Sequence, residues 1–125
     1  MKTFLTLFVL FFIFLPSTAW SEWEKYFEDK DTVYYYDNEK ITKTTTYTYY
    51  KQMRDYKIPD PDGNKSDIIY TVTNCQNVVE FQYYEIYLYK QQLGNGKKIK
   101  IQGSKKWEIA VPMSAQMNLH MIICN

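Results

Sequence analysis

The chain has 125 residues, of which 15 are Lys or Arg and 14 are Asp or Glu, so its formal net charge is +1. This balance argues against nucleic acid or an anionic membrane as a general partner, because both are bound largely through an excess of positive charge. The length is sufficient for one modest domain with a single core.

The N-terminus predicts a signal peptide over residues 1–19. Lys2 precedes an apolar run at positions 4–15, and small residues follow up to Ala19, which together are the three parts of a secretory signal. A membrane anchor is the alternative, but a spanning helix needs about 20 predominantly apolar residues. We expect cleavage after Ala19 to leave one exported domain at 20–125, not membrane-spanning, in the periplasm or at the cell surface.

Next in the chain we expect a short helix and two strands. The helix covers 21–29, where Ser21 and Glu24 have the spacing of a capping box and the aromatic residues recur at spacings of three and four. Residues 32–36 and 42–56 are rich in Thr, Tyr and Val, which suit a half-buried pleated surface. The two strands should therefore lie in one sheet with the helix docked on it.

Residues 58–67 are the strongest break in the chain. Prolines and Gly63 supply turn geometry and deny a strand its donors. The spacing of Asp60, Asp62 and Asn64 resembles the start of a calcium loop, but the distant Glu of such a loop is missing. We interpret the segment as a solvated loop.

A central β-hairpin is predicted over 68–89, with its turn at Cys75 to Asn77. Cys75 has only one intrachain partner available, Cys124, and an exported chain meets an oxidising compartment. We therefore predict a disulfide between them, which would stabilise the fold by about 4 kcal/mol in the chain-entropy model. Two separate buried thiols are the alternative.

The C-terminal part predicts a second hairpin and a final helix. Asn95-Gly96 suits a two-residue turn in which both residues adopt positive φ, and strands are expected at 97–101 and 107–111. Ser114 can cap a helix that runs to about residue 123.

A stripe of sulfur-containing residues runs along this predicted helix. Met113, Met117, Met121 and Cys124 recur at spacings of four, four and three, with His120 beside them. We interpret the stripe as the face that packs on the sheet and carries Cys124 towards the central hairpin. Binding of Cu(I) by these soft ligands is the alternative, but we expect neither a metal site nor a cofactor.

The sequence lacks catalytic motifs, whereas it is rich in residues that are typical of recognition surfaces. The chain has one His, no Gly-x-Ser-x-Gly motif and no Gly-rich phosphate loop, so we do not expect an enzyme. Tyrosine provides rigid contact area with a polar tip, is enriched in recognition surfaces, and occurs 13 times. Tyrosines that fill the faces of a thin sheet, and lysines that protect an edge strand, are the alternative. The candidate partner-binding residues are Tyr47, Tyr49, Tyr50, Tyr83, Tyr87, Tyr89, Lys97, Lys98 and Lys100.

Short motifs in a fixed order resemble the surface adhesin E-like family of Gram-negative bacteria. The resemblance covers nearly all of residues 20–125. Its motifs are Trp23, Tyr35-Tyr36-Asp37, the strand from Ser66 to Cys75, Trp107-Glu108-Ile109, Pro112-x-Ser114 and the near-terminal Cys124.

The resemblance implies an α+β fold, in which an antiparallel sheet of about six strands carries the C-terminal helix on one face; the short N-terminal helix completes our prediction. It also implies a cell-surface protein that binds host extracellular-matrix or serum proteins, and it allows homodimers. A periplasmic structural or small-ligand-binding module without adhesin activity is the alternative function. A closed pocket would favour that alternative, and a flat exposed face would favour the adhesin.

Overall fold

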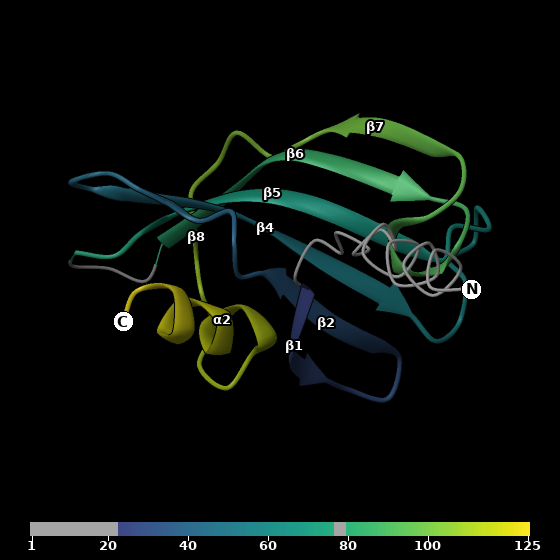
Figure 1. The fold of residues 1–125 in the computed structure, drawn as a ribbon, viewed down its shortest axis with the longest axis horizontal. Helices are drawn as coiled ribbons and strands as arrows, with labels where there is room; N and C mark the ends of the chain where they lie inside the picture. The colour runs from purple at the N-terminus through teal and green to yellow at the C-terminus, as the bar shows by residue number, and fades with distance from the viewer. Residues whose placement is uncertain (1–22, 77–79) are drawn as a thin grey trace, which may run out of the picture.

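The computed structural model describes residues 23–76 and 80–125. The predicted signal peptide at 1–19, the capping-box Ser21 and the turn residue Asn77 lie outside the described residues. The described chain forms one twisted antiparallel sheet, and a single helix in this part of the chain lies against one of its faces (Figure 1). The predicted antiparallel sheet and C-terminal helix are confirmed.

Six strands form the main path of the sheet, in the order β1-β2-β4-β5-β6-β7, and two short strands pair with its interior. β3 pairs with β4 beyond the end of β2, and β8 pairs with β6 beyond the end of β7. The elements are β1 (Trp23–Glu28), β2 (Thr32–Asp37), β3 (Thr42–Lys43), β4 (Tyr47–Tyr56), β5 (Ser66–Asn74), β6 (Glu80–Tyr89), the 3₁₀ turn η1 (Gln92–Gly94), β7 (Lys98–Gln102), β8 (Glu108–Ile109) and α2 (Ala115–Ile123).

The predicted N-terminal helix is wrong, because the segment forms strand β1 and pairs with β2. A bulge between Lys25 and Phe27 inserts one extra residue, so Tyr26 and Phe27 both contact Tyr34, with ring centroids 6.0 and 5.5 Å apart. This bulge explains the helix-like spacing of the aromatic residues. A helix this short is marginal in water, whereas the strand gains hydrogen bonds with β2 on both sides of the bulge.

Helix α2 begins as predicted, with the Ser114 hydroxyl accepting a hydrogen bond from the Met117 amide at 3.1 Å. Leu119 and Ile123 pack on Tyr36 and Tyr50 of the sheet. No helix in the described part of the chain has the length and apolar character that a membrane span requires.

The predicted methionine face of α2 is wrong. Met113 precedes the helix and is 95% exposed, and Met121 is 55% exposed. The buried face instead carries Gln116, Leu119, His120 and Ile123. Two of these side chains hydrogen-bond groups on the sheet, which sets the rotation of the helix and leaves Met113 and Met121 outside, while Met117 is half-buried.

The connection between β6 and β7 also differs from its prediction. The strands pair, but Asn95 has a φ of −108° and only Gly96 follows it with a positive φ, so a two-residue turn with both residues at positive φ does not form. The chain instead makes η1, whose Leu93 amide donates to Asp55 Oδ1 at 2.8 Å. Gly94 then lies against Ile68 and Met53 at one end of the sheet. This end of the sheet is thereby covered.

Candidate recognition face

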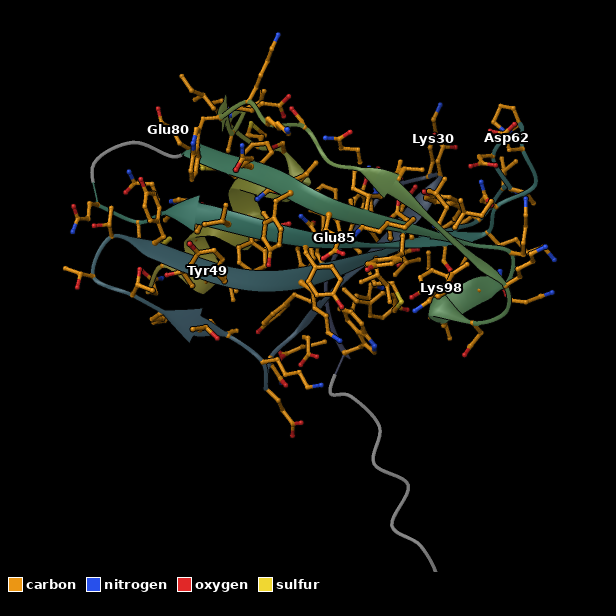
Figure 2. All side chains as sticks on the ribbon, turned by 90° about the horizontal axis from the view of Figure 1, so that it is seen from above. Lys30, Tyr49, Asp62, Glu80, Glu85 and Lys98 are labelled. Atoms are coloured by element: carbon orange, nitrogen blue, oxygen red, sulfur yellow. A yellow bond between two sulfur atoms is a disulfide. The ribbon has the colours of Figure 1, made fainter. Side chains whose placement is uncertain are left out.

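The sheet surface opposite α2, here called the open face, is the candidate functional site. Strand pairing places the odd-numbered residues of β4 and the even-numbered residues of β5 on it. Figure 2 looks onto this face, with α2 behind the sheet, and labels Tyr49, Glu85 and Lys98. Its covered end is the one under η1, and no other element of the described residues covers the rest.

Four tyrosines from three adjacent strands form a continuous line across the open face, here called the tyrosine row. Ring centroids lie 6.2 Å apart for Tyr49 and Tyr84, 6.2 Å for Tyr84 and Tyr70, and 5.8 Å for Tyr70 and Tyr87. Tyr49 is 38% and Tyr84 is 42% exposed. The row therefore presents large aromatic surface to solvent while its rings hold one another in place.

A stacked aromatic pair lies at the other end of the open face from η1. Trp107 stacks on Tyr47 with ring centroids 5.4 Å apart and an angle of 24° between the planes. Both rings are more than a third exposed. The segment before β8 thus adds an aromatic group to a face that is otherwise made by strands.

A pocket of about 340 Å³ opens beside the tyrosine row. It is lined by Lys40, Thr42, Tyr49, Tyr50, Lys51, Tyr70 and Tyr84. Its walls therefore combine aromatic rings, a hydroxyl and two ammonium groups.

One of the two pocket lysines is held by the protein. Lys51 Nζ lies 3.4 Å from Asp37 Oδ2 and 5.2 Å from the centroid of the Trp23 ring. The Asp37 carboxylate is fully buried, and its Oδ1 accepts hydrogen bonds from the Glu39 and Lys40 amides at 3.0 and 3.3 Å. Asp37 thus orients both the Lys51 ammonium and the backbone that carries Lys40.

Charged groups from β6 and β7 continue the tyrosine row. Lys98 Nζ lies 5.1 Å from the centroid of the Tyr87 ring, and Lys100 Nζ lies 2.9 Å from Glu85 Oε1. The Tyr87 hydroxyl donates to the same Glu85 oxygen at 2.6 Å, which raises the pKa of Tyr87 to about 12 and lowers the pKa of Glu85. Burial raises the pKa of Tyr84 as well. At neutral pH the Tyr84 and Tyr87 hydroxyls therefore stay protonated and can donate hydrogen bonds.

The structure brings together only part of the predicted recognition set. Tyr47, Tyr49, Tyr87 and Tyr89 lie on the open face by their strand register, and so do Lys98 and Lys100 on β7. Lys97 is exposed in the turn before β7.

Two predicted members, Tyr50 and Tyr83, lie on the α2 side instead, which corrects the prediction. Tyr50 is 3% exposed, because it alternates with Tyr49 along β4. Tyr83 changes sides because Thr71 pairs with Tyr83 and Tyr70 pairs with Glu85, which leaves Tyr84 as a bulge in β6. The strict alternation that we assumed fails at that residue.

The two tyrosines on the α2 side belong to a buried hydrogen-bond network. Gln116 Oε1 accepts from Gln52 Nε2 and from the Tyr83 hydroxyl, both at 3.1 Å, and Gln116 Nε2 donates to the Tyr50 hydroxyl at 2.8 Å. Gln52 Nε2 also donates to Thr71 Oγ1 at 3.1 Å. These residues fasten α2 to the sheet, and burial raises the pKa of Tyr50 accordingly.

Sequence reasoning missed Tyr70, Tyr84, Trp107, Lys40 and Lys51 as members of the site. Period-two alternation already separated Tyr70 from Thr71, and the register with β4 places Tyr70 opposite Lys51, on the same face as Tyr49. The bulge at Tyr84 and the stacking of Trp107 leave no local sequence signal.

Metal-ligating side chains do not converge in residues 23–76 and 80–125. No group of three or more His, Cys, Asp or Glu side chains in these ranges has the geometry to hold a metal ion. Cys124 is bonded to Cys75, which confirms the predicted disulfide and removes the thiol from the proposed Cu(I) set. Asp60 uses its carboxylate within its own loop, accepting from the Asp62 and Asn64 amides at 3.0 and 2.8 Å.

The model of the family described as Surface-adhesin protein E matches residues 20–125. The chain belongs to this family. The matched range contains the whole described sheet, α2 and the disulfide, so the assignment includes the open face. The family is described as one of surface adhesins, which implies export to the cell surface.

Solved structures of Haemophilus influenzae protein E share the fold of this surface-adhesin family member. Crystal form II matches with a TM-score of 0.66 and 20% identity over 87% of this chain and 91% of that chain. The crystal structure of protein E from non-typeable Haemophilus influenzae matches with a TM-score of 0.60 and 21% identity over 87% of this chain and 79% of that chain. No curated protein matches the chain.

Proposed function

We propose that this protein is a surface adhesin that binds a host extracellular-matrix or serum protein through the open face. The observation that carries the proposal is the tyrosine row, whose rings lie on the face that α2 leaves uncovered. Tyrosine and tryptophan are the residues that protein recognition surfaces use most, because they contribute large area at low cost in conformational entropy.

The charged side chains of the open face indicate which groups of a partner it can bind. Lys51, Lys98 and Lys100 lie on it, and Lys40 opens onto its pocket. Glu85 and Asp37 each pair with one lysine, and strand register places Asp55 and Glu80 on the same face. Lys40 and Lys98 belong to none of the described ion pairs, so the positive charge at the pocket and beside Tyr87 favours acidic groups of the host protein, because complementary potentials raise the association rate and exclude wrong partners.

Binding of immobilised host matrix and serum proteins by the purified domain tests the proposal. Replacing Tyr49 and Tyr84 together by alanine should weaken binding about tenfold or more, the loss typical of central aromatic contacts. Ile58→Ala is the control, because Ile58 is exposed in the loop between β4 and β5, away from the open face. Equal losses of affinity in the two variants, or no loss in the double variant, would show that the binding site lies outside the tyrosine row.

Exposure to the host is a separate requirement. An adhesin should be cleaved when intact cells are treated with a protease, whereas a periplasmic protein is protected until the outer membrane is opened. Protection on intact cells would favour the second candidate, a periplasmic module that holds a small ligand. The pocket of about 340 Å³ has the volume that this candidate needs, since binding sites for small molecules start at about 300 Å³, but it opens onto the sheet face, which favours the adhesin.

A further inference from the structure

The pocket beside the tyrosine row has a mixed lining that indicates the chemistry of its occupant. The rings of Tyr49, Tyr70 and Tyr84 supply aromatic surface, and Thr42 supplies a hydroxyl. The faces of aromatic rings carry partial negative charge and attract polarised C–H groups. A pyranose ring offers such C–H groups on its faces and hydroxyls at its edge, so both parts of the lining would be used.

The charge of the pocket adds a second requirement. Lys40 and Lys51 line it, and its lining contains no carboxylate from the described residues. Lys51 is held by Asp37, but Lys40 makes no ion pair with any described carboxylate and its side chain is exposed. An anionic group on the sugar would therefore meet an ammonium group whose backbone is positioned by Asp37.

The surroundings of the pocket favour a chain of sugars over a single free one. The pocket opens onto the tyrosine row, which continues through Tyr70 and Tyr87 to the Lys98 ammonium. A linear glycan that leaves the pocket along this row would pass further rings and the Glu85–Lys100 ion pair, and end at a second cation.

We propose that the open face binds an acidic glycan, with one carboxylate- or sulfate-bearing sugar residue in the pocket against Lys40 and Tyr84. This inference rests on the proposed function and deepens it, since it names the part of the host matrix that the open face contacts. Sialylated and sulfated glycans are two sources of the same chemistry, an anion on a pyranose ring.

Calorimetric titration of the purified domain with three defined oligosaccharides tests the inference. A heparin-derived hexasaccharide carries sulfates and carboxylates, a sialylated oligosaccharide carries only a carboxylate, and maltohexaose is neutral. At least one acidic oligosaccharide should bind about tenfold or more tightly than maltohexaose, and the stronger of the two shows whether the source is a sulfated or a sialylated glycan. Equal affinity for the neutral and acidic sugars, or no binding by any of them, would overturn the proposal.

Matched variants separate the pocket from general attraction to a polyanion. Lys40→Gln should weaken binding of the preferred oligosaccharide about fivefold to tenfold. Lys30→Gln removes the same charge from the exposed turn between β1 and β2 and should leave affinity within about twofold. Equal losses of affinity in the two variants would overturn the assignment of the anion to the pocket. Tyr84→Leu provides an independent check, because it keeps apolar volume but removes the aromatic face, and unchanged affinity would also overturn the proposal.

Treating the immobilised host proteins with glycosidases distinguishes failure of this inference from failure of the proposed function. Loss of binding after glycan removal supports the inference. Full binding to deglycosylated protein, with no affinity for the free oligosaccharides, overturns the inference and leaves the proposed function standing. Affinity for the oligosaccharides without attachment to any host protein supports the glycan site and overturns the adhesin function.

Discussion

Replacing both Cys75 and Cys124 by alanine tests how much the disulfide between the sheet and α2 stabilises the domain. The disulfide links the end of β5 to the C-terminus of α2 across 49 residues, with the two Cα atoms 5.4 Å apart. Loss of a cross-link of this span frees the unfolded chain and should lower the free energy of unfolding by about 4 kcal/mol. Domains of this size are stable by about 5 to 15 kcal/mol, so the variant should fold but with a small margin.

The native contacts of α2 give a second expectation for the same variant. Leu119 and Ile123 still pack on the sheet, and Gln116 still hydrogen-bonds three side chains of it. Far-ultraviolet circular dichroism at low urea should therefore match that of the unmodified protein.

Urea unfolding followed by tryptophan fluorescence measures the effect. With an m-value of about 1 to 2 kcal/mol per molar urea, the midpoint should fall by about 2 to 4 M. Met121→Ala on the exposed side of α2 is the control and should change stability by less than about 0.5 kcal/mol. A loss below about 1 kcal/mol in the cysteine variant would refute the reasoning, because loop closure would then contribute little.

Three further perturbations test the buried polar groups. Gln116→Leu leaves the Tyr83 hydroxyl without its acceptor and should cost about 2 to 3 kcal/mol in urea unfolding; a neutral result would show that these groups find other partners. Asp67→Asn removes the fully buried carboxylate that holds the Arg54 guanidinium. Because the Arg54 side chain is 37% exposed, we expect a moderate fall in melting temperature, about 5 to 10 °C. No change in melting temperature would exclude this ion pair as a source of stability. Burial lowers the pKa of His120 below its usual 6.5, so the unfolded chain binds the proton more tightly and stability should fall as pH drops below about 6.5. His120→Gln should reduce that fall between pH 7 and 5.5, and an unchanged slope would assign the effect to other groups.

The placement of the tyrosines shows where prediction from sequence stopped. Alternation along β4 separates Tyr49 from Tyr50, but it does not say which of the two meets α2. Leu119 and Ile123 of α2 pack on Tyr50, which covers that side of the sheet and leaves the side of Tyr49 open. Tyr83 changed faces for a different reason, since the bulge at Tyr84 depends on the pairing of β6 with β5.

The sequence by itself determined the features that depend on local chemistry or on having one choice. Two cysteines allow one intrachain disulfide, Ser114 caps the helix that follows it, and β-branched and aromatic runs form the central hairpin. Only the tertiary structure decided that β1 is a strand, which face of α2 is buried and which tyrosines share a surface. Those outcomes depend on pairing and packing between segments far apart in the chain, and a one-residue bulge is sufficient to move Tyr83 to the other face.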